Sequence, residues 1–283
     1  PRERAGKILG NGFVLLVLFA VVTSAVSYLF MKPILTSIGA SSHTLPHAVD
    51  YLSVYLLGTL FVEVAVGLNT FINCQGRPGV AMCSVIIGAV LNIVLDPLFI
   101  FTFGMGVKGA ALATILSQAC SAVWVLVFLT SRRASLQLER KYLRLDRRIV
   151  GATLALGLSP FIMASTESLV GFVLNGSLER YGDIYVSALA VMQAAMLCVS
   201  VPLTGFAQGF VPVASYNYGH GNRERVKECF KIVVTVMFLF NFLLVLLMIL
   251  FPSVVSAIFT DDVRLTETVG HTMPVFLGGM SIF

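Results

Sequence analysis

The chain has 283 residues, of which 57% are hydrophobic and 12% are charged, with a formal net charge of +5. Soluble domains carry roughly 25% charged residues, so the composition excludes an ordinary soluble protein. The basic excess lies in short segments between apolar runs, a pattern typical of membrane topology, and we therefore exclude nucleic acid as a partner.

Eight apolar runs follow one another along the chain. They cover residues 11–30, 50–73, 79–101, 108–130, 148–176, 185–213 and 230–259, and the last begins at 268 and is cut off at 283. Runs of about 20 residues cross the hydrocarbon core of a bilayer as helices. We therefore expect an all-α polytopic membrane protein, with about eight transmembrane helices in this stretch.

The polar segments between the runs alternate in charge. One set, at 1–8, 74–78, 131–148 and 219–231, holds 15 of the 19 Lys and Arg residues. Positive residues are retained on the cytoplasmic side of a membrane. We therefore expect a multi-pass protein of the plasma (inner) membrane with these basic segments in the cytoplasm.

A shift of 221 residues superposes two parts of the sequence. The motif RER occurs at 2–4 and at 223–225, and VYLLG at 54–58 aligns with VFLGG at 275–279. Two halves with the same topology are a common plan of transporters.

This repeat predicts two lobes of six helices in the intact protein. Residues 1–131 would hold helices 3–6, residues 132–148 would form a cytoplasmic connector, and residues 149–283 would hold helices 7–10, the last of them truncated. The first two helices of the intact protein would then precede Pro1, and its last helices would follow Phe283.

Polar groups interrupt two neighbouring runs between Asn92 and Thr114. Asp96 follows Asn92 by four residues, so both side chains share one helix face. Pro97 has no N–H and leaves the carbonyl of Ile93 without its usual donor. A carboxylate in hydrocarbon must be paired, neutralised or open to water. Together with amide and hydroxyl oxygens it favours a site for a proton or a small cation.

Simpler structural roles remain open for these residues. Asp96 lies close to the end of its run, where a carboxylate can accept hydrogen bonds from nearby backbone. Thr114 can donate its hydroxyl proton back to its own helix, as threonines in membrane helices often do.

Other polar residues are secondary candidates. Glu167 lies in the middle of its run, and a desolvated carboxylate favours its protonated form, so it could exchange protons; the alternative is a buried, hydrogen-bonded Glu. We expect Glu63, Asn175, Gln193 and Gln208 near the substrate cavity. Such residues also join helices through interhelical hydrogen bonds.

Several motifs together carry a family resemblance. They are NTFINCQGRPGVAM at 69–82, GAVLNIVLDPLFIFTFGMGVKGAALATILSQ at 88–118, SPFIMASTESLVGFVLN at 159–175 and QGFVPVASYNYGHGNRERVK at 208–227. The chain resembles the multidrug and toxic compound extrusion (MATE) transporters, in particular their bacterial drug-efflux branch.

This resemblance implies a secondary active antiporter and not an enzyme. By alternating access it would export small organic compounds, often cationic and lipophilic, in exchange for H⁺ or Na⁺. It implies no cofactor, no metal beyond Na⁺, and a monomer in the bilayer. In relatives with a cation site in the first lobe, Asn92, Asp96 and Thr114 match three positions, and the fourth is an aspartate on the first helix.

Two other classes of protein are alternatives. A flippase or exporter of a lipid-linked oligosaccharide or another amphiphile could share the two-lobe plan, but its cavity should be cationic, and the runs contain no internal Lys or Arg. An intramembrane prenyl transferase would need DxxxD pairs for Mg²⁺-diphosphate, which the sequence does not show.

Overall fold

The computed structural model describes residues 2–37, 44–178, 181–260 and 262–280, and the regular structure within these ranges is entirely helical. Seven segments of this part are long and apolar enough to cross a membrane. The prediction of an all-α polytopic membrane protein is therefore confirmed. The chain forms two compact units, Pro1–Ala164 and Ser165–Phe283, which are described separately.

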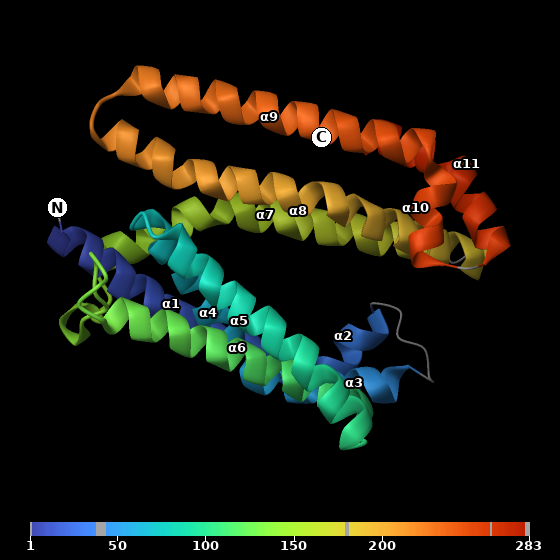
Figure 1. Ribbon diagram of the computed structural model, residues 1–283. Coiled ribbons are helices and arrows are strands. Elements are labelled where there is room, and N and C mark those ends of the chain that lie inside the picture. Colours follow the sequence, from blue (N-terminus) through green and yellow to red (C-terminus); the bar gives the residue numbers. More distant parts are fainter. Residues whose placement is uncertain (1, 38–43, 179–180, 261, 281–283) are drawn as a thin grey trace. The chain divides into compact units, whose positions relative to one another are not determined.

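Four helices of the first unit pack side by side, and two shorter helices lie near one end (Figure 1). In chain order the elements are α1 (Arg2–Leu29), α2 (Met31–Ser37), α3 (Leu45–Tyr55), α4 (Thr59–Cys74), α5 (Pro78–Pro97) and α6 (Gly106–Thr130). A 3₁₀ turn, η1 (Leu56–Gly58), joins α3 to α4, and a π-helical turn, η2 (Leu98–Thr102), extends α5.

Close contacts between helices hold this unit together. Gly88 of α5 lies against Ser121 of α6, where a Cβ atom would meet the hydroxyl. Leu68 and Ile72 of α4 pack with Leu129 of α6 and are fully buried. In a bilayer, where lipid is as apolar as the core, such close packing and interhelical hydrogen bonds drive helix association.

The turn between α4 and α5 follows from its residue types. Gly76 has a φ of 72°, a left-handed conformation that favours glycine and commonly ends a helix. Pro78 then opens α5, where its missing N–H removes no helical hydrogen bond.

The basic connector after α6 is folded onto the first unit. It contains one short 3₁₀ turn, η3 (Arg140–Tyr142). The side chains of Leu136 and Leu138 pack on the apolar core, and the Leu138 N–H donates to the carbonyl of Leu129 at 2.9 Å. The N-terminal end of α1 and this connector lie at the same end of the unit (Figure 1).

Helix α7 (Arg147–Leu178) crosses the division between the two units and contains Pro160. None of its most apolar window is buried. The helix therefore presents an apolar surface to its surroundings. The predicted lobes, with their boundary at 132–148, concern the intact protein and stay a prediction.

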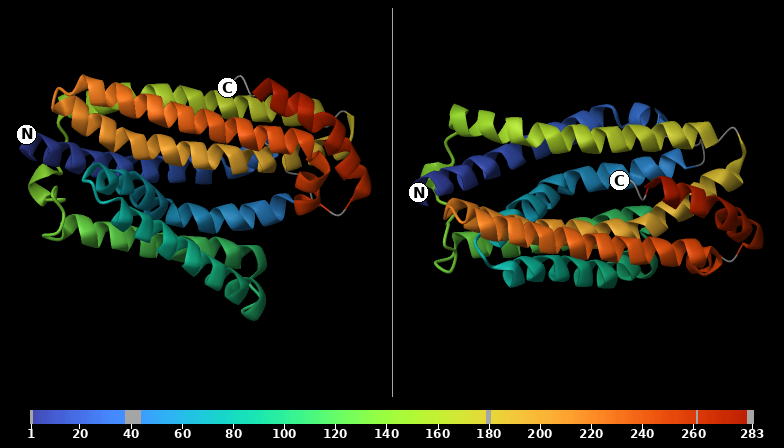
Figure 2. Two further views of the ribbon diagram at one scale, coloured as in Figure 1. Left: turned by 45° about the horizontal axis from the view of Figure 1, so that its top comes forward. Right: turned by 90° about the horizontal axis from the view of Figure 1, so that it is seen from above.

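An antiparallel helix pair dominates the second unit (Figure 2). Its members are α8 (Asp183–Gly219) and α9 (Arg223–Leu250), and α10 (Pro252–Phe259) and α11 (Val263–Met280) follow at the far end. The side chain of Asn222 caps α9 by accepting a hydrogen bond from the Arg225 N–H at 3.2 Å. Met273 and Leu277 of α11 pack on α8 and are almost fully buried.

Seven of the eight predicted runs coincide with the membrane-length helices of the described part. The run at 230–259 is interrupted, because α9 ends at Leu250 and Pro252 opens α10. Proline cannot donate the hydrogen bond that would continue a helix. The eighth run lies in α11, which is helical but is not one of the seven.

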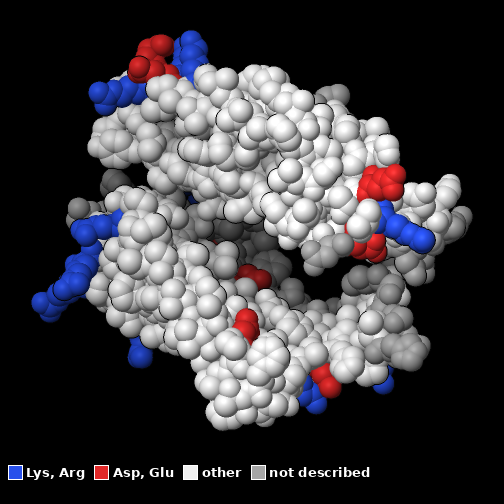
Figure 3. Space-filling view, turned by 45° about the vertical axis from the view of Figure 1, so that its right-hand side comes forward, with Lys and Arg blue, Asp and Glu red and all other residues white. Residues whose placement is uncertain are grey.

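Charged groups are unevenly distributed over the surface (Figure 3). On the face shown there, Lys and Arg atoms lie towards the margins, and most of the surface between them is uncharged. This is the distribution expected of helices that cross hydrocarbon and end in water.

Candidate functional site

The three polar residues predicted to form a cation site come together between α5 and α6. The amide nitrogen of Asn92 lies 3.2 Å from Oδ1 of Asp96 and 3.5 Å from Oγ1 of Thr114. All three side chains are half-buried. One amide thus bridges a carboxylate on its own helix and a hydroxyl on the next, within two membrane-length segments.

Contacts on either side of these three residues fix the register of α5 against α6. Towards the start of α5, the Ser121 hydroxyl donates to the carbonyl of Ser84 at 2.8 Å, and Gly88 lies against Ser121. Beyond the other end, Gly109 packs on the carbonyl of Phe99, leaving no room for a Cβ atom. Thr114 is therefore held opposite Asn92.

The hydroxyl of Thr114 serves two partners. It donates its proton to the carbonyl of Ala110 at 3.0 Å, as the simpler structural interpretation expects. Its oxygen remains free to accept from Asn92, since a hydroxyl has one proton and two lone pairs. The two interpretations of Thr114 are therefore compatible.

The carboxylate of Asp96 has no cationic partner in the part of the chain that the structure describes. The ion pairs there are Glu3–Lys7, Asp50–Lys108, Glu139–Lys141 and Glu224–Lys227. The hydrogen bond described for Asp96 comes from Asn92 and not from backbone. A carboxylate within a membrane span requires compensation, which a proton, a small cation or an aqueous opening can supply.

The backbone beside Asp96 departs from regular α-helix. The helix continues through Pro97, and the π-helical turn η2 follows at once, with the Phe103 N–H donating to the carbonyl of Leu98 at 3.0 Å. Pro97 cannot donate to the carbonyl of Ile93. Single π-helical turns occur frequently at functional sites and mark places where a helix can rearrange.

The two acids named as secondary candidates lie on other helices. Glu63 is half-buried on α4 and makes no hydrogen bond with the three residues in the described part. Glu167 lies on α7 and is exposed. Their predicted roles stay predictions.

The predicted amide residues of the second unit lie on two helices. Gln193 and Gln208 are exposed on α8, so neither is held in a buried hydrogen bond. Asn175 lies in α7, but its side chain is outside the described residues.

A buried polar contact that sequence reasoning did not single out joins α4 to α5. The amide nitrogen of Asn69 donates to Oγ of Ser84 at 2.8 Å and to the carbonyl of Ala81 at 3.1 Å. Its amide oxygen is buried without a partner. The available signal was an amide residue in an apolar run, but its partners lie 12 and 15 residues away.

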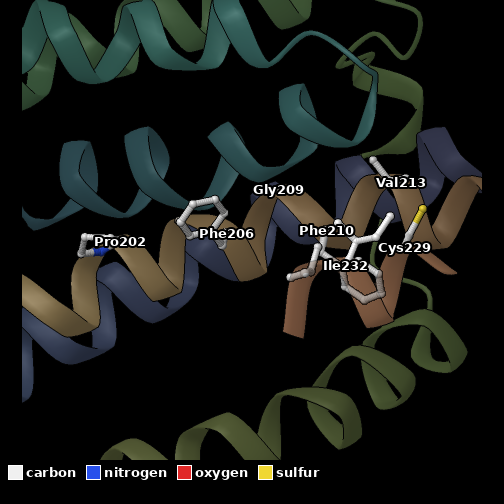
Figure 4. A pocket seen from close by; sticks show the side chains of 9 residues that line it. Pro202, Phe206, Gly209, Phe210, Val213, Cys229 and Ile232 are labelled. Atoms are coloured by element: carbon white, nitrogen blue, oxygen red, sulfur yellow. The ribbon is translucent and has the colours of Figure 1, made fainter. Parts of the chain in front are cut away.

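An apolar groove runs between α8 and α9 in the second unit (Figure 4). Its volume is about 540 Å³, and Phe206, Phe210, Cys229 and Ile232 contribute to its lining. Glycines and a proline of α8 complete much of the wall.

The membrane-length helices and the polar cluster within two of them define a polytopic α-helical membrane protein. A family model described as MatE matches residues 2–98 and 160–283. The chain therefore belongs to the MatE family, and the resemblance drawn from its motifs is confirmed.

A curated relative is named Multidrug export protein MepA, from Staphylococcus haemolyticus (strain JCSC1435). It is 26% identical over 252 residues, which are 89% of this chain and 55% of the relative. The chain thus spans about half the length of the curated relatives it matches.

Solved structures of the same fold cover nearly the whole chain. One is described as a MATE in the straight conformation, with 25% identity, a TM-score of 0.86, and coverage of 98% of this chain and 62% of that one. Another is described as a multidrug resistance MATE family transporter in an outward-facing conformation, with 23% identity, a TM-score of 0.90, and coverage of 99% and 63%. The chain belongs to a transporter family and not to an enzyme family.

Proposed function

We propose that this chain is part of a secondary active antiporter that exports lipophilic, often cationic organic compounds in exchange for H⁺ or Na⁺. The observation that carries the proposal is the placement of Asn92 against both Asp96 and Thr114. The name of the MepA relative, a multidrug export protein, supports the substrate class. No enzymatic step is involved.

The hydrogen bonds support a cation site in the first unit. The Thr114 proton is used by Ala110, and the Asn92 amide protons face Asp96 and Thr114. The remaining groups are oxygen lone pairs, which suit a proton or a small hard cation. When that cation binds, the carboxylate no longer needs the amide protons, and Asn92 can turn its own oxygen towards the site.

Coupling then follows from one shared equilibrium. A neutralised Asp96 costs less to bury than a charged one, so cation binding favours the conformation in which the site is closed. The π-helical turn beyond Pro97 gives α5 a place to bend. If substrate binds better to the open conformation, cation and substrate displace each other, which is the basis of antiport by alternating access.

The residues proposed to contact the substrate lie in both units. Soft apolar and aromatic surfaces adapt to varied compounds, and the groove of Phe206 and Phe210 offers such a surface. We place Glu63, Asn175, Gln193 and Gln208 with the substrate path. Glu167 is proposed as a second, proton-exchanging acid.

The intact protein is proposed to act in the plasma (inner) membrane as a monomer. Its lobes would correspond to residues 1–131 and 149–283, joined by a cytoplasmic connector at 132–148. The basic segments would face the cytoplasm, in keeping with their share of the Lys and Arg residues.

Replacement of Asp96 tests this function. In cells that express the intact protein, Asp96→Asn should abolish gradient-driven efflux of a cationic dye such as ethidium, while membrane insertion is unchanged. Asp50→Asn is the matched control, because Asp50 belongs to the same unit and is already paired with Lys108 at 3.2 Å. Full efflux by Asp96→Asn would refute the site.

A further inference from the structure

The connector between α6 and α7 must lie at the membrane surface. Both helices are long and apolar enough to cross a bilayer, and only residues 131–146 separate Thr130 from Arg147. Residues 131–148 hold seven basic and two acidic side chains. The basic ones are Arg132, Arg133, Arg140, Lys141, Arg144, Arg147 and Arg148.

One buried residue, Asn11 of α1, fastens this connector. Its side chain is 1% exposed. The amide nitrogen donates to the carbonyls of Lys7 at 2.8 Å and Arg144 at 3.1 Å, and the amide oxygen accepts from the Asp146 N–H at 2.7 Å. Asn11 therefore joins α1 to Asp146, the residue directly before α7.

Further contacts hold the rest of the connector in place. Gly6 and Gly10 of α1 lie directly against Tyr142, where a Cβ atom on either glycine would overlap it. The side-chain oxygen of Gln75 accepts from the Leu136 N–H at 3.0 Å. The connector is thus a fixed part of the first unit and not a free tether.

In the folded connector, apolar side chains pack on the core and basic side chains are exposed. Ala134 is buried, and Leu136 and Leu138 pack on the core. The basic side chains are exposed, and Leu145 among them is 50% exposed. An apolar residue surrounded by exposed arginines fits a surface that meets a bilayer.

The two acidic side chains of the connector have other contacts than its arginine side chains. Glu139 pairs with Lys141 at 2.7 Å, and this hydrogen bond raises the pKa of Lys141, with a further contribution from Tyr142. Asp146 accepts from the backbone N–H of Arg148 at 2.9 Å. No arginine forms an ion pair in the part of the chain that the structure describes.

We propose that the folded connector is a binding surface for anionic phospholipid headgroups, with the exposed arginines as ligands of the phosphodiester. Guanidinium groups bind phosphate oxygens in bidentate geometry. Basic residues beside a membrane attract anionic lipid individually, and a fixed backbone spares the ordering cost that a mobile loop would incur. The proposal does not depend on the transported substrate.

Native mass spectrometry of the intact protein, released from vesicles of equal phosphatidylglycerol and phosphatidylcholine, tests this surface. The wild type should retain phosphatidylglycerol preferentially. Arg132/Arg133/Arg144→Gln should lose roughly 100-fold in that preference, about fivefold for each arginine. Arg223/Arg225/Lys231→Gln removes the same charge from exposed positions of α9 and should lose clearly less of the preference than the connector variant, because these side chains do not belong to the fixed cluster of arginines.

A third variant tests whether lipid binding needs the fixed arrangement of the arginines or only their charge. Asn11→Ala keeps every arginine but removes the hydrogen bonds that hold Arg144 and Asp146. It should lose most of the phosphatidylglycerol preference while the protein stays folded and inserted in the membrane, with only a modestly lowered Tm. A wild type without lipid preference, equal losses in both triple variants, or full preference in Asn11→Ala would each overturn the proposal.

Discussion

Asn92 is the residue whose two contacts organise the candidate site. Its amide faces the carboxylate of Asp96 and the hydroxyl of Thr114 at once. In a low-dielectric environment these hydrogen bonds are stronger than in water. If one partner is lost, the remaining polar groups stay buried without a hydrogen bond, which destabilises the site.

Thr114 offers the cleanest test at this scale. Thr114→Val keeps the side-chain shape but removes the oxygen that faces Asn92, so the affinity for the coupling ion should fall roughly tenfold. The measurement is the ion concentration that gives half-maximal transport in vesicles. Thr114→Ser keeps the hydroxyl and should stay close to wild type, and a normal Thr114→Val would contradict the role of this oxygen.

At the residue scale, the contacts that can be predicted from the sequence are those between residues close together on one helix. Asn92 and Asp96 were paired because residues four apart share a helix face. Asn11 was missed because its partners Arg144 and Asp146 lie more than 130 residues away in the chain. An amide within an apolar run signals a buried hydrogen bond, but only the folded chain supplies the partner.

At the element scale, the pairing of α5 with α6 positions the site. Gly88 permits the close approach and Ser121 ties the two backbones through the carbonyl of Ser84. Both helices can be predicted from the apolar runs, but their register cannot. The π-helical turn η2 could not be predicted from the sequence either. The missing N–H of Pro97 was the one sign there that the helix is irregular.

Enlarging Gly88 should disrupt this pairing. Gly88→Val would force its side chain into Ser121, and overpacking of this kind typically costs about 1–3 kcal/mol. Thermal unfolding of the purified intact protein should show the loss as a lowered Tm. Gly79→Val is the matched control, since Gly79 is on the same helix with no neighbour close to a Cβ atom. Equal Tm values for the two variants would contradict the close contact.

The connector makes a second prediction at this scale. Without the hydrogen bonds of Asn11, the chain around Arg144 should become mobile, so trypsin should cleave the connector of Asn11→Ala faster than that of the wild type. Limited proteolysis followed by mass spectrometry gives the cleavage rates. Asn217→Ala removes an amide that bonds only within its own helix and should leave them unchanged. Unchanged cleavage in Asn11→Ala would show that the connector is held by other contacts.

At the scale of the whole molecule, composition predicted the class and the motifs predicted the family. Helix number and approximate bounds followed from apolar length, whereas the break at Pro252 divided one predicted run into two helices. Thr114, the partner of Asn92 on the next helix, was indicated both by its place in the neighbouring run and by the resemblance.

In the proposed mechanism, Asp96 binds the ion that exchanges with substrate. The most direct measurement is release of bound H⁺ or Na⁺ from the purified intact protein when a substrate such as ethidium is added. Release is expected from the wild type and none from Asp96→Asn, although substrate still binds to that variant. Equal release from both proteins would contradict it.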